Sequence, residues 1–313
     1  MKILLTGTSG QLGQSLVKAL NDVCELITPN RHELDLSNVA SIAPYIQQCK
    51  PDLIINPAAY TAVDLAEKER ETAFRVNAQA PTVFAQEAKK LGIGLIHFST
   101  DYVFDGSKAT ANGEQLPYNE QDSCKPLNVY GASKLAGEQA ITESGCQHLI
   151  LRTSWVYSDF GKNFLLTILR LAKEKTDLNI VNDQWGTPSS TLFLSDVTKQ
   201  IWLQMQGANN AASWWQNHSG IYHLTPDGFT NWCEFSQEIV NSASHLGLLD
   251  MPRPNIHGIP SSAYPTPAQR PMNSRLDKTK IIRDFGITIP DWRTALQVCM
   301  QDLAGKKQSG SSI

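Results

Sequence analysis

The sequence predicts an α/β protein: a Rossmann-type, doubly wound parallel sheet followed by a smaller C-terminal α/β lobe for substrate binding. Three observations predict this fold class. Short apolar runs alternate with amphipathic helical stretches in the first half, a glycine-rich turn directly follows the first apolar run, and the alternation loosens after about residue 157. Short apolar runs separated by helices are typical of right-handed βαβ units with parallel strands buried on both faces.

The elements of the first half follow from the spacing of apolar residues. Strands are expected at residues 2–6, 26–28, 53–55, 93–98 and 148–152. Helices are expected at about residues 12–20, 39–46 (with Ser37 as N-cap), 73–91 and 129–143. We therefore assign residues 1–157 to a dinucleotide-binding domain.

The second half is expected to form mainly the substrate-binding lobe, over residues 158–304, with a frayed tail at 305–313. Residues of about 190–225 are expected to return to the first domain. Helices are expected at 164–173, 193–205, 231–246 and 292–303, and strands at 178–181 and 221–224. Residues 207–220, which include Trp214 and Trp215, are expected to form a surface loop, and the proline-rich segment 264–271 an extended one.

Composition excludes several classes of function. Among 313 residues, 27 Lys and Arg balance 30 Asp and Glu, giving a net charge of −3, too weak for nucleic-acid binding. No apolar stretch is typical of a signal peptide or a membrane span. The six cysteines are scattered singly and the seven histidines form no HExxH pattern, so we expect reduced thiols, a cytoplasmic protein and no tightly bound metal.

The glycine-rich turn carries the first functional signal. Gly7, Gly10 and Gly13 lie where the first strand turns into the first helix. Glycines there permit a tight turn and close approach of the backbone to a pyrophosphate, which the helix N-terminus attracts. The turn therefore predicts dinucleotide binding, and its GxxGxxG spacing resembles the extended branch of the short-chain dehydrogenase/reductase superfamily.

The end of the second strand bears on the choice of cofactor. Residues 28–31 contain no acidic residue to accept the ribose 2′-hydroxyl, whereas Arg31 could pair with a 2′-phosphate. NADP(H) is therefore favoured and NAD(H) remains possible. In the alternative, Arg31 is solvated and Glu33 or Asp35 reaches the adenosine.

A catalytic constellation follows from two further motifs. Tyr130 and Lys134 form the single YxxxK of the chain and share one face of a predicted helix, so the lysine is expected to lower the pKa of the phenol. Thr100 (or Ser99) and Asp101 directly follow the fourth strand, at the sheet edge where open α/β folds bind ligands. Alone, these residues could be a strand-end cap. Together with Tyr130 they indicate ketone–alcohol redox chemistry.

Several longer segments resemble the dTDP-4-dehydrorhamnose reductase family nearly end to end. Besides the glycine turn, the similar segments are Asn56–Asp64, Ser99–Gly106, Pro126–Gly131, Arg152–Tyr157, Asn182–Pro188 and Tyr264–Leu276. The resemblance implies reduction of the 4-keto group of dTDP-4-dehydro-L-rhamnose to dTDP-L-rhamnose. It implies that Tyr130 is the proton donor, Lys134 its partner and Thr100 the residue that polarises the keto group.

The resemblance also implies the binding residues. Gly10, Gln11 and Leu12 would cover the pyrophosphate and Asp35 and Leu36 would lie near the adenine, while the cofactor channel would be lined by Ala58, Ala59, Tyr60 and Thr61. Thr100, Asp101 and Trp155 would meet the sugar. From the residues themselves, Asn163, Gln184 and Arg270 are candidates for the rest of the nucleotide-sugar; a surface salt bridge of Arg270 is an equal alternative.

Two departures from the family pattern and two rival functions remain. Pro57 stands where a small residue is usual, and Ser15 stands where some members carry a glutamate that bridges a dimer through a metal, so we expect a monomer or weak homodimer. One rival is a non-catalytic NADP-binding regulatory subunit of S-adenosylmethionine synthetase. The other is a reductase or epimerase of a different nucleotide-sugar.

Overall fold

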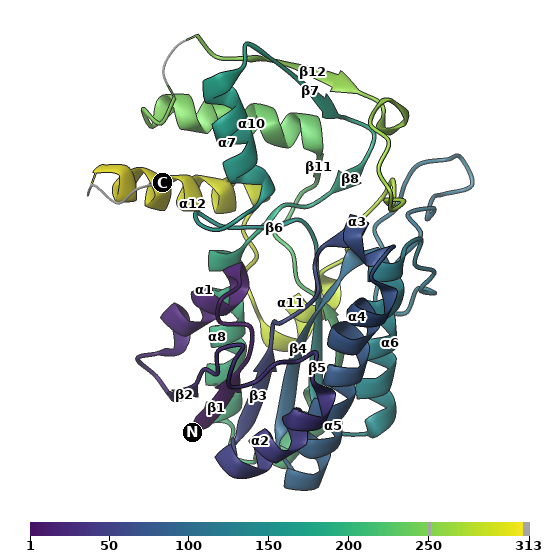
Figure 1. Cartoon of the computed structure of the whole chain (residues 1–313), viewed down its shortest axis with the longest axis vertical. Coiled ribbons are helices and arrows are strands. Elements are labelled where there is room, and N and C mark those ends of the chain that lie inside the picture. Colours follow the sequence, from purple (N-terminus) through teal and green to yellow (C-terminus); the bar gives the residue numbers. More distant parts are fainter. Residues whose placement is uncertain (250–251, 309–313) are drawn as a thin grey trace.

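The computed structural model describes residues 1–249 and 252–308 and is built around a six-stranded parallel sheet with helices on both faces (Figure 1). The strand order is β10-β5-β4-β3-β1-β2. The strands are β1 (Lys2–Leu5), β2 (Glu25–Ile27), β3 (Leu53–Asn56), β4 (Gly94–Thr100), β5 (Gln147–Thr153) and β10 (Gly220–His223). The predicted Rossmann-type fold class is confirmed. Because the order reverses between β1 and β3, the carboxyl ends of these strands border a crevice that suits a ligand.

Alternating side chains of each strand enter two different cores. Ile3 and Leu5 pack into the core beneath α1 (Gln11–Leu20) and α8 (Thr191–Gly207). Leu4 packs into the opposite core, formed with α2 (Ile42–Cys49), α5 (Ala80–Leu91) and α6 (Val129–Ser144). This alternation is the pattern of a strand buried on both faces. It explains why the strands appear in the sequence as continuous apolar runs.

Three local predictions were wrong. Residues 207–220 do not form a loop, because Ala211–His218 is helix α9, with both Trp214 and Trp215 buried against the sheet. Ser37 is not an N-cap: its backbone N–H donates to Asp35 Oδ1 at 2.9 Å, and a 3-10 turn at Val39–Ser41 precedes α2. The helix expected at 73–91 begins earlier, as α4 (Arg70–Phe74), and includes a π-helical turn at Arg75–Gln79.

A second lobe lies beyond the carboxyl ends of the sheet strands (Figure 1). Its helices α7 (Phe164–Glu174), α10 (Trp232–His245) and α12 (Trp292–Gln308) share one hydrophobic core. A parallel pair, β7 (Asp177–Val181) with β12 (Asn255–Ile259), packs on α10. Two further pairs are short: β6 (Val156–Tyr157) with β9 (Ser189–Ser190), and β8 (Trp185–Gly186) with β11 (Thr230–Asn231).

The predicted C-terminal tail and the segment predicted to return to the first domain can both be compared with the structure. Residues 305–308, expected to be frayed, continue helix α12, whereas residues 309–313 lie outside the described residues. Helix α8 and strand β10, within the segment expected to return to the first domain, pack on and extend the large sheet. The domain boundaries themselves stay a prediction. Within the described parts of the chain, no helix is long and apolar enough to span a bilayer.

Candidate active site

The glycine turn between β1 and α1 has a conformation that other residues would not tolerate. Gly7 has φ +60°, and the Gly10 N–H donates to the Gly7 carbonyl at 2.9 Å before the helix begins at Gln11. A Cβ on Gly13 would lie 2.1 Å from the Gly7 carbonyl oxygen. The turn therefore brings bare backbone to the carboxyl end of β1, and a bulky phosphate group fits such a glycine cradle at a helix N-terminus.

Hydrogen bonds of Gln11, next to this turn, connect the turn to the second lobe. The Gln11 side-chain oxygen accepts hydrogen bonds from Ser158 Oγ at 2.7 Å and from Asn163 Nδ2 at 2.8 Å. Asn163 is also the N-cap of α7, accepting from Leu166 N, so its amide is engaged on both sides. Leu12 is buried in the sheet core. The predicted substrate residue Asn163 thus contacts the predicted cofactor residue Gln11.

The loop after β2 carries the residues predicted to lie at the adenosine. The Arg31 side chain is 82% exposed and its Nε lies 3.8 Å from Asp35 Oδ1. The Ser37 backbone N–H, with smaller help from the Ser37 hydroxyl and Arg31, lowers the pKa of Asp35. Leu36 is partly buried against the core under α2. Arg31 is therefore free to meet an anion from solvent at only a small cost, because an exposed pair is weak.

The loop after β3 approaches the glycine turn closely. A Cβ on Gly7 would lie 2.9 Å from Ala58 Cα. Asn77, in the π-helical turn, accepts from the Tyr60 backbone N–H at 2.8 Å and donates to its carbonyl at 3.1 Å. The Tyr60 hydroxyl donates to Glu69 Oε2 at 2.9 Å. These bonds hold the segment that contains Ala58, Ala59, Tyr60 and Thr61 beside the turn.

Thr100, Asp101 and Tyr130 meet at the carboxyl end of β4. Thr100 Oγ1 donates to Asp101 Oδ1 at 2.9 Å and accepts from the Tyr102 backbone N–H at 3.2 Å. The Thr100 side chain also lies beside the Tyr130 phenol and opposes the rise of its pKa. Tyr130 lies in the first turn of α6, which Asn128 caps by accepting from Gly131 N at 2.8 Å. A phenol and a threonine hydroxyl thus lie together at the ligand-binding edge of the sheet.

The titration of these groups differs in one respect from expectation. Burial raises the pKa of Tyr130 above its usual value; the hydrogen bond with Thr100 opposes this rise and the charge of Asp101 adds to it. The expected lowering by Lys134 is absent, because Lys134 Nζ instead donates to the Phe98 carbonyl at 2.6 Å and lies 3.1 Å from His97 Nε2. Burial lowers the pKa of Lys134 to about 8, against the opposing effect of Glu138.

Asp101 is also perturbed by its surroundings. Burial raises the pKa of this carboxyl to about 6, although hydrogen bonds from the Ser274 and Thr100 hydroxyls oppose the rise. It is 2% exposed. A carboxyl that titrates near neutrality beside Thr100 and Tyr130 is the kind of perturbed group that gathers at functional sites.

The predicted substrate residues farther from Tyr130 are spread over two regions. Trp155 has φ +47° and stacks on Trp232 with ring centroids 3.6 Å apart, over Gly186. Gln184 and Arg270 line one pocket of about 390 Å³ with the proline-rich segment. Arg270 already makes a bidentate ion pair with Asp64, at 2.7 and 2.8 Å, so the salt-bridge alternative is present in this structure.

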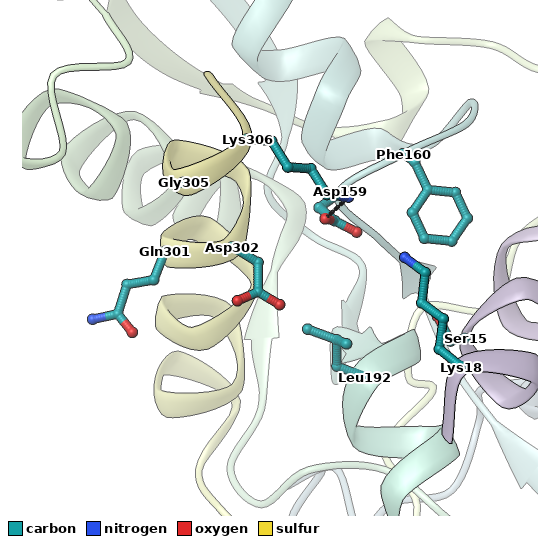
Figure 2. Close-up of a pocket in the computed structure, with 9 residues that line it drawn as sticks. All are labelled: Ser15, Lys18, Asp159, Phe160, Leu192, Gln301, Asp302, Gly305 and Lys306. Atoms are coloured by element: carbon teal, nitrogen blue, oxygen red, sulfur yellow. Dashed lines mark hydrogen bonds and ion pairs between the residues drawn. The ribbon is translucent and has the colours of Figure 1, made fainter. Parts of the chain in front are cut away.

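A second pocket, of about 420 Å³, lies between α1, α12 and the loop after β6 (Figure 2). Neither pocket is lined by Thr100, Tyr130 or Lys134. Ser15, which lines the second pocket, donates to Thr191 Oγ1 at 2.8 Å and is 3% exposed. Over residues 1–249 and 252–308, no group of three or more His, Cys, Asp or Glu side chains is arranged to hold a metal ion.

Sequence reasoning missed the polar residues buried behind the catalytic candidates. Thr6 directly follows β1, Asn56 ends β3 and His97 lies in the middle of β4; these three connect to Lys134 by hydrogen bonds. Arg152 and Glu138 form an ion pair in which both side chains are 2% exposed. The signal was available, because polar residues inside apolar strand runs of a parallel sheet are buried and need partners. The partners, however, become visible only when the strands are aligned.

Comparison with known proteins identifies the family. The family model described as RmlD substrate binding domain matches residues 1–304. A dTDP-4-dehydrorhamnose reductase of Burkholderia thailandensis is 42% identical over 304 residues, covering 97% of this chain and 99% of the relative. The crystal structure of a dTDP-4-dehydrorhamnose reductase from Clostridium acetobutylicum has a TM-score of 0.85 at 32% identity, covering 97% and 99% of the two chains.

A second solved structure bears on the cofactor. The dTDP-4-dehydrorhamnose reductase from Bacillus anthracis, in complex with NADP, has a TM-score of 0.84 at 31% identity and covers 96% of this chain and 99% of that one. The similarity therefore includes the glycine turn, the Thr100 and Tyr130 region and the second lobe. This chain belongs to the dTDP-4-dehydrorhamnose reductase family of oxidoreductases.

Proposed function

We propose that this protein reduces the 4-keto group of dTDP-4-dehydro-L-rhamnose to a hydroxyl, giving dTDP-L-rhamnose, with NADPH as the reductant. The observation that carries the proposal is the placement of Thr100 beside the Tyr130 phenol at the carboxyl end of β4. The names of the relatives and the NADP in one of their structures support it. When bound, the cofactor supplies a hydride to the carbonyl carbon.

The glycine turn and its neighbours would hold the cofactor. Gly7, Gly10 and Gly13 leave room for the pyrophosphate at the N-terminus of α1, with Gln11 and Leu12 over it. Arg31 would pair with the 2′-phosphate, which favours NADP(H) over NAD(H), and Asp35 and Leu36 would lie near the adenine. The segment from Ala58 to Thr61 would line the nicotinamide side.

Tyr130 would donate the proton in this reaction. Its raised pKa keeps the phenol protonated at neutral pH, which is the form that a proton donor needs. Thr100 would hydrogen-bond the keto oxygen, and Lys134, one helical turn beyond Tyr130, would donate a hydrogen bond to the nicotinamide ribose. Asp101 and Trp155 would contact the sugar ring.

The rest of the nucleotide-sugar would extend toward the second lobe. Gln184 and Arg270 border the 390 Å³ pocket, and a diphosphate that reached Arg270 would compete with Asp64 for its guanidinium. Asn163 would position Gln11, because its side-chain amide donates a hydrogen bond to the Gln11 side-chain oxygen. We further propose residues 158–304 as mainly the substrate lobe, and a monomer or weak homodimer. All six cysteines are unpaired, which supports a cytoplasmic location.

The proposal is tested by following NADPH oxidation at 340 nm with the keto nucleotide-sugar. We expect turnover by the wild type and a loss of at least about 100-fold in kcat for Tyr130→Phe, because the proton donor is gone. Tyr45→Phe, on α2, is the matched control. Comparable rates in Tyr130→Phe and wild type would contradict the proposed role. Absence of wild-type turnover, with tight binding to an S-adenosylmethionine synthetase, would favour the regulatory alternative.

The cofactor preference has its own test. Arg31→Ala should raise KM for NADPH about tenfold and leave KM for NADH unchanged, because only NADPH carries the 2′-phosphate. Arg170→Ala, at an exposed position on α7, is the control. An unchanged ratio of the two KM values would mean that Arg31 is not the phosphate partner.

A further inference from the structure

A buried chain of hydrogen bonds connects the proposed catalytic lysine to the glycine turn. Thr6 Oγ1 is 2.6 Å from Asn56 Oδ1, Asn56 Nδ2 is 3.0 Å from His97 Nδ1, and His97 Nε2 is 3.1 Å from Lys134 Nζ. None of these four side chains is more than 2% exposed. Asn56 and His97 are direct partners in the register between β3 and β4, and Thr6 immediately precedes Gly7.

The chain is complete in each of two hydrogen-bonding arrangements. With a neutral amine, Thr6 donates to the Asn56 oxygen, the Asn56 amide donates to Nδ1, and the Nε2–H tautomer of His97 donates to Lys134. With an ammonium, Lys134 donates to Nε2, the Nδ1–H tautomer donates to the Asn56 oxygen, and the turned amide donates to Thr6. In both arrangements Lys134 still donates to the Phe98 carbonyl.

We propose that His97 is a positioning residue for Lys134. The imidazole ring of His97, hydrogen-bonded on its other side to Asn56 and through Asn56 to Thr6, holds the Lys134 amine in one place whether the amine is neutral or charged. This inference rests on the proposed function, because it concerns a lysine that the proposed reaction uses. A buried polar group without partners is costly. A rigid donor opposite Lys134 would repel the ammonium, and a rigid acceptor would leave the lone pair of the neutral amine without a donor.

The other charged groups around Lys134 do not replace this role. Glu138, on the same helix, raises the pKa of Lys134, but its carboxylate is bound by Arg152 of β5 and by Ser99 of β4. Asp101 of the turn after β4 is engaged with Thr100. His97 itself stays neutral, because burial and the charge of Lys134 hold its pKa well below the usual value. A neutral imidazole is the one state that both donates and accepts.

The test measures the titration of Lys134 directly, in the protein without cofactor, by NMR of lysines labelled with ¹³C at Cε. The wild-type midpoint should lie near pH 8. His97→Phe removes a charge-assisted acceptor from the ammonium and should lower the midpoint by about one pH unit. His97→Gln keeps a donor and an acceptor and should recover at least half of that shift. His148→Phe, which replaces a buried histidine on the adjacent strand β5, should leave the midpoint unchanged.

A second variant covers the case in which His97→Phe does not fold. Asn56→Asp places a carboxylate opposite Nδ1, fixes Nε2 as an acceptor and should raise the midpoint, the opposite sign to His97→Phe. A midpoint in Asn56→Asp or His97→Phe that equals that of the wild type overturns the proposal.

Kinetics separate this inference from the proposed function. The alkaline limb of the pH profile of kcat/KM should move in each variant by the same amount and in the same direction as the NMR midpoint. A general loss of packing would lower activity without moving the limb. Shifted midpoints together with no wild-type turnover of the keto nucleotide-sugar would overturn the proposed function and leave the role of His97 standing.

Discussion

The buried ion pair between Arg152 and Glu138 should make a large and strongly coupled contribution to stability. Arg152 Nη2 donates to Glu138 Oε2 at 2.6 Å and Nε donates to Oε1 at 3.0 Å, with both side chains 2% exposed. Arg152→Met would leave the Glu138 carboxylate with the Ser99 hydroxyl as its remaining partner. Removing one member of a buried pair costs about 3–5 kcal/mol, because an uncompensated charge stays in the interior.

The assay is a double-mutant cycle measured by urea unfolding. The wild type, Arg152→Met, Glu138→Gln and the double variant are compared by tryptophan fluorescence and far-UV circular dichroism, without cofactor. We expect the double variant to be less destabilised than the sum of the single variants by about 2 kcal/mol or more. Additivity within about 0.5 kcal/mol would refute the reasoning.

The pH dependence of the free energy of unfolding provides an independent check that the loss comes from an unpaired charge. In Arg152→Met the folded state holds a buried negative charge without its partner, and acid, which removes negative charge, should relieve part of that cost. The loss in the free energy of unfolding of Arg152→Met, relative to the wild type, should therefore be smaller at pH 5 than at pH 7.5. A deficit that does not change with pH would mean that the loss is one of packing and not of charge.

Two further predictions concern the site. The pKa of Asp101 is raised to about 6 in the folded state, so its contribution to stability is present below the unfolded pKa and is lost as the pH rises through 6. Asp101→Asn should therefore be more stable than the wild type at pH 7.5, by at most about 3 kcal/mol in the free energy of unfolding. Urea unfolding should show this difference vanishing near pH 4. Gly13→Ala would place a methyl group 2.1 Å from the Gly7 carbonyl and should weaken NADPH binding at least about tenfold in a fluorescence titration, whereas Gly207→Ala, which meets nothing within 4 Å, should not.

The sheet and its helices could be predicted because each strand is buried on both faces and so appears as an apolar run. Helix α9 could not, because the polar residues of 207–220 have little helical preference and the helix depends on burying Trp214 and Trp215. The short pairs β6–β9 and β8–β11 join distant segments and have no local signal. They follow from tertiary packing alone.

The candidate site was predictable where the signal is local. Tyr130 and Thr100 were found from a helical spacing and a strand end, and the structure brings them together. The partner of Lys134 was not found, because His97 contacts it from a strand 37 residues away. The engagement of Arg270 by Asp64, 206 residues distant, was likewise left open by the sequence.

Gly94 and Trp215 show how a choice at one point of the chain is enforced from another. A Cβ on Gly94 would lie 2.0 Å from Cζ2 of the Trp215 indole, so the first residue of β4 has no side chain because Trp215 of α9, 121 positions later, fills that volume. Any larger residue at 94 would expel the indole, and a smaller residue at 215 would leave a void beneath the strand. A substitution at either of these two positions therefore requires a compensating substitution at the other.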